Sequence, residues 1–264
     1  MYNNRSSFLQ SIPPVVKNLI AINVIMWLAT ISLPASVQQW GKFDNLVDLL
    51  GMHYWTSGKF QLTQLVSYMF LHGNFSHLFF NMFALFMFGG VIENFWGPKR
   101  FLIYYFATGI GAGLVQQVFW SIEYNSIITA MNDAILHNSP EYLLPIEPFL
   151  NSHFKITGLS NFGIPQMLEL KNMFLNIPVT IGASGAVFGL LLAFGWLFPE
   201  ARLMMIFFPV PIKARVFVIF YGVAELFLGV VNFSGDSVAH FAHLGGMLFG
   251  VMLILFWKKK AKLY

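Results

Sequence analysis

Long apolar runs, separated by shorter polar stretches, make up most of the chain. A helix needs about 20 apolar residues to cross a bilayer. Runs of about that length lie near residues 15–33, 74–95, 101–120, 180–198, 214–233 and 238–257. This pattern predicts an all-α, polytopic membrane protein built on six spanning helices.

Two connections are long enough to carry structure of their own. One joins the first two helices, and the other covers about residues 121–179, between the third and fourth. The second mixes Pro, Asn and short amphipathic pieces, so we expect a loop with about two surface helices rather than a second domain. The predicted organisation is therefore a short segment over 1–14, one helical domain over 15–257 and a basic tail over 258–264.

The composition agrees with a membrane fold and excludes several other classes. Of the 264 residues, 57% are hydrophobic and 10% charged, and the mean hydropathy is +0.66. Soluble domains carry about 25% charged residues. Because the chain has no Cys, it forms no disulfide, thiolate metal site or cysteine nucleophile.

The net charge of +4 follows from membrane topology and does not indicate nucleic-acid binding. Lys and Arg collect in cytoplasmic loops. With the N-terminus inside, eleven basic residues fall inside and four outside, the latter being Lys42, Lys59, Lys155 and Lys171. We therefore expect both termini to be cytoplasmic and the protein to lie in a bacterial inner membrane. The KKKAK tail is then a topology anchor, with a lipid-binding patch as the alternative.

Unusual polar residues lie near the starts of the second, fourth and sixth predicted helices. They are His72, His77, Asn81, Ser184, His240 and His243. Any one alone is ordinarily a packing serine or an interfacial histidine. These three helices all enter from the outer face, however, and ionisable groups inside membranes usually face a protein interior or a watery cavity. Together the residues predict a polar site.

Spacing suggests that Ser184 and His243 meet. Counted from Pro178 and Asp236, each lies roughly 10 Å along its helix at about 1.5 Å per residue. Small residues recur every fourth position on both helices, at Gly185, Gly189 and Ala193 and at Ala242, Gly246 and Gly250. Such ridges allow membrane helices to approach closely.

A serine close to a histidine indicates nucleophilic catalysis. Neutral imidazole is the usual base that activates a serine hydroxyl, and the oxyanion formed during acyl transfer needs donors. Backbone N–H groups near Ser184, the Asn81 amide and a His77 ring nitrogen are the candidates. No membrane Asp is placed to orient His243, so the sequence predicts a dyad rather than a triad. Phe188, one turn after Ser184, is expected to stack on His243.

At these residues the chain resembles the rhomboid intramembrane serine proteases. The matching motifs are GASG around Ser184, AHLGG around His243 and HGNFSHLFFN on the second helix, and the likeness covers about residues 60–255. The resemblance implies Ser184 as nucleophile and His243, rather than its neighbour His240, as general base and then acid. It also implies supporting roles for the remaining motif residues, which are His77, Asn81, His72 and Gly182.

The resemblance further implies that the fifth helix is a mobile wall past which substrate enters. Glu225 on that helix is interpreted as a buried structural acid, with gating as the alternative, and Glu93 as structural. Two features depart from the family. Thr63 and Gln64 stand where it usually has a Trp–Arg pair, which puts the anchoring of the first outer loop in doubt, and the loop over 121–179 is longer than the core requires.

The sequence thus predicts an endopeptidase that cuts spanning segments of other membrane proteins near the outer face. Its partners would be those substrates and the bilayer, with no nucleic acid, cofactor or metal; the sequence carries no signal for oligomeric state. One alternative is an inactive relative that binds and escorts membrane helices. The other is a transporter using the histidines, although no carboxylate or thiolate is expected beside His240 and His243 to complete a metal site.

Overall fold

The computed structural model describes residues 12–33, 41–156, 158–205, 208–231 and 238–260. Internal contacts divide the chain into two compact units. Unit 1 comprises Met1–Met52, Leu62–Gln116 and Thr180–Tyr264, and unit 2 comprises His53–Gln61 and Gln117–Val179.

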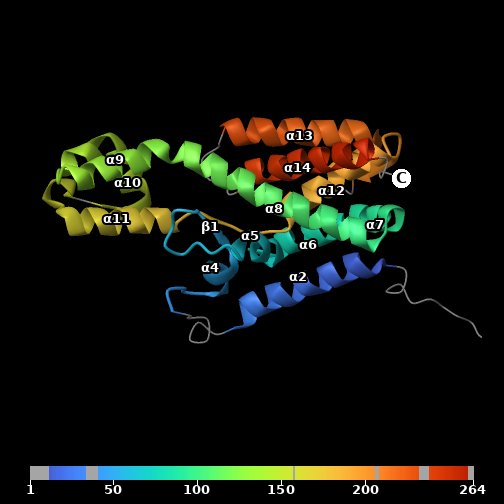
Figure 1. Ribbon diagram of the computed structural model, residues 1–264, viewed down its shortest axis with the longest axis horizontal. Helices are drawn as coiled ribbons and strands as arrows, with labels where there is room; N and C mark the ends of the chain where they lie inside the picture. Colours follow the sequence, from blue (N-terminus) through green and yellow to red (C-terminus); the bar gives the residue numbers. More distant parts are fainter. Residues whose placement is uncertain (1–11, 34–40, 157, 206–207, 232–237, 261–264) are drawn as a thin grey trace, which may run out of the picture. The chain divides into compact units, whose positions relative to one another are not determined.

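The apolar helices lie in unit 1, apart from residues 117–123 of the third one, and they follow the predicted spans to within a few residues. They are α2 (Pro14–Ser32), α6 (Phe75–Ala84), continued through the wider turn η2 (Leu85–Gly89) into α7 (Gly90–Trp96), α8 (Pro98–Glu123), α12 (Ser184–Leu197), α13 (Ala214–Val231) and α14 (His240–Lys259) (Figure 1). Within the described residues, five spans are long and apolar enough to cross a membrane, and α12 is a shorter apolar helix. The all-α, polytopic fold class is therefore confirmed.

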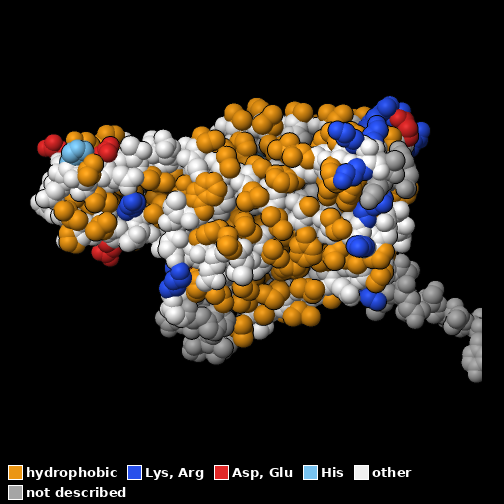
Figure 2. All heavy atoms as spheres, viewed as in Figure 1, with side chains coloured by type: hydrophobic (Ala, Val, Ile, Leu, Met, Phe, Trp, Pro, Cys, Tyr) orange, Lys and Arg blue, Asp and Glu red, His pale blue; other side chains and the backbone are white. Residues whose placement is uncertain are grey.

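Burial separates central helices from peripheral ones. Over their apolar windows α8 is 56% buried and α14 50%, whereas α2 is 17% and α13 22% buried. The side chains that α13 leaves exposed are mostly aliphatic and aromatic, among them Ile219, Phe220 and Phe227. Figure 2 shows this apolar surface as a broad orange band. Side chains of this kind suit contact with lipid, so α2 and α13 are peripheral spans.

Glycines bring α12 and α14 into backbone contact. A β-carbon on Gly246 would overlap the carbonyl oxygen of Gly185, so only glycine fits at that crossing. The rest of the predicted ridge behaves differently, because a β-carbon on Gly189 would lie 2.6 Å from Thr108 on α8. The small residues therefore serve two interfaces. Gly246 allows α14 to reach the backbone of α12, whereas Gly185 and Gly189 allow α12 to approach α8, where a β-carbon on Gly185 would lie 2.4 Å from Ala112.

The first loop of unit 1 is tied together by polar side chains. It contains α4 (Leu46–Leu50), α5 (Gln64–Ser67) and the short η1 (Tyr68–Phe70). The fully buried Gln64 donates from Nε2 to the Leu49 carbonyl at 3.1 Å, and Ser67 Oγ donates to the Leu50 carbonyl at 2.7 Å. Gln64, which departs from the family pattern, thus links two helices of this loop.

A short antiparallel hairpin, which the sequence analysis did not predict, joins α12 to α13. Its strands are β3 (Arg202–Met205) and β4 (Phe208–Lys213), with Arg202 opposite Lys213 and Leu203 opposite Ile212. Lys213 also makes an exposed ion pair with Glu200 at 2.7 Å. The remaining strands, β1 (Met52–His53) and β2 (Val179–Thr180), are two residues each.

One end of unit 1 is basic. There Glu93 accepts hydrogen bonds from the Val15 and Val16 amides at 3.0 and 2.8 Å, which caps the start of α2, and the Arg100 guanidinium lies 5.6 Å from the Trp257 ring. The exposed or half-exposed basic residues near these helix ends are Lys17, Lys99, Arg100, Lys258, Lys259 and Lys260. Most of the blue side chains in Figure 2 gather at this end. Glu93 is therefore structural, as expected; Arg5 and Lys262 lie outside the described residues.

Unit 2 is more structured than the sequence analysis expected. In place of a loop with two surface helices it contains α9 (Asn125–Leu136), η3 (Pro140–Ile146), α10 (Glu147–Phe154), η4 (Leu159–Asn161) and α11 (Ile164–Asn176). Its buried side chains include Met131, Leu143, Leu150, Leu170 and Phe174. The amphipathic pieces thus face each other and bury a small core of their own.

Candidate active site

Ser184 is the first residue of α12. Its spacing from Pro178 predicts a depth of roughly 10 Å along a helix at about 1.5 Å per residue. That depth is wrong, because the chain is not helical before Ser184. The first N–H groups of a helix have no acceptor within it, and this end of the helix dipole is positive. Negative charge that develops beside Ser184 is therefore stabilised.

Gly182 shapes the turn that delivers Ser184. Its φ of +128° lies in a region that favours glycine. A β-carbon there would stand 2.8 Å from His77 Nε2 and 3.6 Å from Ser184 Oγ. The His77 ring and the Ser184 hydroxyl therefore both lie close to the side of Gly182 where other residues carry a side chain. The Gly182 amide donates to the Tyr68 carbonyl at 2.9 Å, which fixes the turn against η1. The first glycine of GASG thus allows His77 and Ser184 to approach each other.

The start of α6 supplies two further candidate groups. Asn74 caps the helix, its Oδ1 accepting from the His77 amide at 2.8 Å. One turn later Asn81 is buried and donates from Nδ2 to the His77 carbonyl at 3.0 Å. A primary amide has two N–H groups, so one remains for another acceptor.

His72 lies against His77 in a buried position. Their ring centroids are 4.9 Å apart, and neither ring nitrogen of His72 has a hydrogen-bond partner among the described residues. Burial, with a smaller contribution from His77, lowers the pKa of His72 to about 3. The ring is therefore neutral near pH 7 and brings no charge to this cluster.

His243 lies one turn into α14 and stacks on α12. Its ring is nearly parallel to that of Phe188, at 8° and a centroid distance of 4.1 Å, so the predicted stacking is confirmed. Phe188 is one turn after Ser184, and the Gly185–Gly246 crossing lies beside both Ser184 and His243 in sequence. The close approach of the two helices thus brings His243 next to the first turn of α12.

Glu225 is buried, as expected, but its contact with the two histidines of α14 was not predicted. Its Oε2 lies 2.9 Å from His243 Nδ1 and 2.7 Å from His240 Nδ1, with all three side chains buried. The expectation that no carboxylate joins these histidines is therefore wrong. The available signal was the antiparallel pairing of consecutive helices. Since α13 ends at Val231 and α14 begins at His240, residues near the end of α13 lie beside residues near the start of α14.

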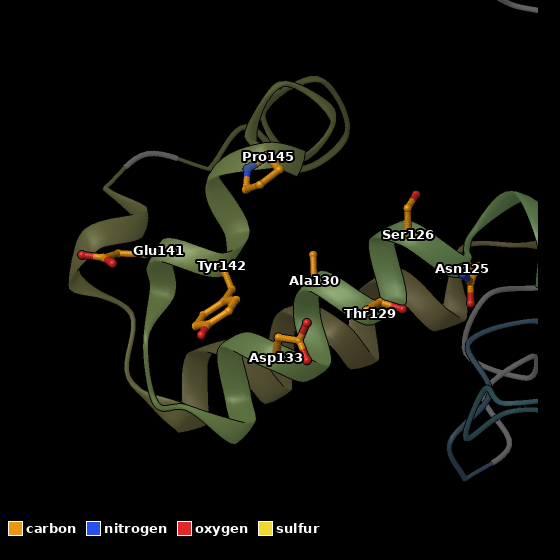
Figure 3. Close-up of a pocket in the computed structure, with 8 residues that line it drawn as sticks. All are labelled: Asn125, Ser126, Thr129, Ala130, Asp133, Glu141, Tyr142 and Pro145. Atoms are coloured by element: carbon orange, nitrogen blue, oxygen red, sulfur yellow. The ribbon is translucent and has the colours of Figure 1, made fainter.

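A separate depression lies within unit 2. It has a volume of about 580 Å³ and is lined by Asn125, Ser126, Thr129, Ala130, Asp133, Glu141, Tyr142 and Pro145 (Figure 3). The Tyr142 ring lies toward Asp133, while the Glu141 carboxylate points away. No histidine is among these lining residues, so the depression lacks the imidazole that usually activates a serine hydroxyl and is not the candidate catalytic centre.

Comparisons with known proteins agree with this geometry. The rhomboid domain profile matches residues 59–131 and 153–260. An uncharacterised mitochondrial rhomboid protein of Schizosaccharomyces pombe is 27% identical over 82% of this chain and 55% of its own length. A Bacillus subtilis protein named Putative rhomboid protease YdcA is 33% identical over 42% of this chain and 53% of its own.

A third relative is the mitochondrial Rhomboid protein 1 of Saccharomyces cerevisiae, 27% identical over 69% of this chain and 38% of its own length. The chain thus spans about half the length, or less, of these curated relatives. The profile leaves residues 132–152 unmatched, and these lie in unit 2. The extra length of the 121–179 segment is therefore an insertion relative to the common domain.

Proposed function

The chain belongs to the rhomboid family, and from this premise we propose that it is an intramembrane serine endopeptidase. It cleaves spanning segments of other membrane proteins near the outer face. The observation that carries the proposal is the position of Ser184 at the start of α12, beside His77 at Gly182 and one turn before Phe188, on which His243 stacks. The reaction requires no metal or cofactor.

In the proposed reaction Ser184 Oγ attacks the scissile carbonyl while His243 takes its proton. The resulting oxyanion is stabilised by N–H groups at the start of α12, by the free N–H of Asn81 and by His77. His243 then returns the proton to the leaving amine, and water hydrolyses the acyl-enzyme by the same route. Phe188 keeps the imidazole in place throughout.

The two alternatives are less well supported. An inactive rhomboid-like escort protein would be expected to lack the nucleophile or the base, and both Ser184 and His243 are present. A transporter that uses the histidines gains a carboxylate in Glu225, but the interhelical approach at Gly185 and Gly246 favours a closed reaction site over a path through the bundle.

Replacing the nucleophile tests the proposed function. Ser184→Ala should abolish cleavage of a single-span substrate, because loss of a nucleophile in acyl transfer typically costs about 10⁶-fold in kcat. It should also abolish labelling by a fluorophosphonate while leaving the melting temperature close to that of the wild type. Ser152→Ala, at an exposed serine of unit 2, is the matched control and should keep both. Full cleavage by Ser184→Ala would contradict the assignment.

We further propose that both termini are cytoplasmic, that unit 2 lies outside and that the membrane is a bacterial inner membrane. The supporting observation is the basic end of unit 1, which carries residues such as Lys99 and Lys259, since positive charge accumulates on the cytoplasmic side. The Cys-free chain permits single cysteines at Ser152 and Lys259. In intact cells an impermeant thiol reagent should label the first and not the second; the reverse result would invert the topology.

A further inference from the structure

Glu225 occupies an unusual position on a peripheral helix. Its neighbours Leu226 and Phe227 are exposed, yet Glu225 is only 7% exposed. A carboxylate inside a membrane span is costly, and such groups are usually paired and functional. Its position therefore needs a stabilising partner, and α14 provides two.

With Glu225 ionised, the contacts imply one protonation pattern for the cluster. A single oxygen, Oε2, lies 2.7 Å from His240 Nδ1 and 2.9 Å from His243 Nδ1. Since an ionised carboxylate only accepts hydrogen bonds, both Nδ1 atoms carry protons. A neutral His243 then has its lone pair on Nε2, which is the nitrogen available to act as a base.

The same three groups are also a conceivable metal site, because their ligand atoms lie within 4.8 Å of one another. The distances favour hydrogen bonds. Tetrahedral zinc, with bonds of about 2.0–2.2 Å, separates its ligand atoms by roughly 3.3 Å. The observed O···N separations of 2.7 and 2.9 Å are shorter than that and typical of charge-assisted hydrogen bonds.

We propose that Glu225 is a positioning residue for His243, which extends the Ser184–His243 pair to a Ser–His–Glu arrangement. The inference rests on the proposed function. Glu225 holds the imidazole as its Nδ1–H tautomer and turns Nε2 toward Ser184, while His240 holds the carboxylate in place by the second hydrogen bond. Phe188 fixes the plane of the ring and Glu225 its rotation within that plane.

Glu225 also acts on the charge that develops during the reaction. As the Ser184 Oγ–C bond forms, the Oγ proton passes to His243 Nε2 and the carbonyl electron pair moves to oxygen. The imidazolium keeps its Nδ1–H bond to Glu225, whose negative charge offsets the new positive one. When the C–N bond breaks, the proton on Nε2 passes to the leaving amine, and Glu225 itself is never protonated.

Two substitutions separate the charge of Glu225 from its hydrogen bond. Glu225→Gln keeps an acceptor and removes the charge, and Glu225→Leu removes both. We expect kcat to fall roughly tenfold in Glu225→Gln and about a hundredfold or more in Glu225→Leu. Both losses are smaller than the approximately 10⁴-fold fall in kcat that follows loss of the orienting acid in a Ser–His–Asp triad. KM should change little, because the group acts in the transition state. Glu225→Asp should recover part of the loss.

Glu93→Gln is the matched control. Glu93 is also a buried acid, but it caps α2 and lies away from the histidines. We expect a lower melting temperature with kcat per folded molecule unchanged. If Glu225→Gln behaves in the same way, with lost stability and unchanged kcat, Glu225 is structural and the proposal is wrong.

Nitrogen-15 NMR of histidine-labelled protein tests the arrangement without relying on activity. His243, assigned with a His243→Asn variant, should be the Nδ1–H tautomer in the wild type and should lose that preference in Glu225→Leu. An unchanged tautomer would overturn the proposal even if the enzyme is active. Inactivity of the wild type would instead refute the proposed function. A metal site would give a different result. Added Zn²⁺ would then stabilise the wild type but not Glu225→Leu, and it would inhibit cleavage until a chelator is added.

Discussion

Helices α13 and α14 are alike in sequence character and differ in the way they pack. Both are long and apolar enough to cross a membrane, yet α13 is 22% buried and α14 50%. α14 places Gly246 against the backbone of α12, whereas a β-carbon on Gly222 of α13 would meet only the end of the Met247 side chain, at 3.3 Å. The length of an apolar run therefore predicts that a helix spans the membrane. Whether the helix is central or peripheral in the bundle depends on where its backbone approaches the backbone of a neighbouring helix.

The difference extends to the candidate chemistry. His243 sits on the central helix, stacked on Phe188, while the carboxylate that contacts it comes from the peripheral helix. The site therefore has two halves. The half made by α12 and α14 is fixed by their close packing, and the position of the other half depends on how α13 packs against them. Substitutions at matched positions of α13 and α14 distinguish the two halves.

Among substitutions that leave every group of the proposed reaction in place, the largest effect is expected from one added methyl group at the central crossing. In Gly246→Ala the new β-carbon overlaps the Gly185 carbonyl, so α12 and α14 must separate. A displacement of about 1 Å can cost roughly a hundredfold in rate, and we expect a loss of that size in kcat/KM together with a lower melting temperature.

Gly222→Ala on α13 is the control for that change. Its β-carbon meets only the flexible Met247 side chain, which can move aside, so activity should stay within about twofold of the wild type, as for most surface substitutions. Both variants are measured by cleavage of a single-span substrate and by thermal unfolding in detergent. Equal losses in the two variants would contradict the distinction between central and peripheral helices.

Much of the fold could be predicted from the sequence, because spanning helices follow from local hydropathy. Six apolar runs became six apolar helices, and the motif spacing indicated Ser184, His243 and the Phe188 stacking. The start of α12 was not predictable from hydropathy, since Val179–Thr180 is apolar enough to read as helix but forms β2. Glu225 was expected to be buried, but its histidine partners were not predicted because they lie on another helix. The core of unit 2 was not predicted because each of its helices is short.

A smaller effect than at the glycine crossing is expected at Phe188, whose ring contacts both of the helices being compared. It stacks on His243 of α14 at 4.1 Å and 8°, and it meets Tyr221 of α13 at 5.9 Å and 51°. Aromatic pairs of this kind contribute about 0.5–1.5 kcal/mol, so Phe188→Leu should lower kcat by roughly two- to tenfold, with Phe188→Tyr close to the wild type. Tyr221→Leu removes the tilted contact between Phe188 and α13, together with the Phe217–Tyr221 contact within α13, and leaves the stack on His243 in place. It should therefore change kcat less than Phe188→Leu does. If Tyr221→Leu lowers kcat more than Phe188→Leu does, the His243 imidazole depends on the peripheral helix for its orientation. The fixed half of the site would then not include His243.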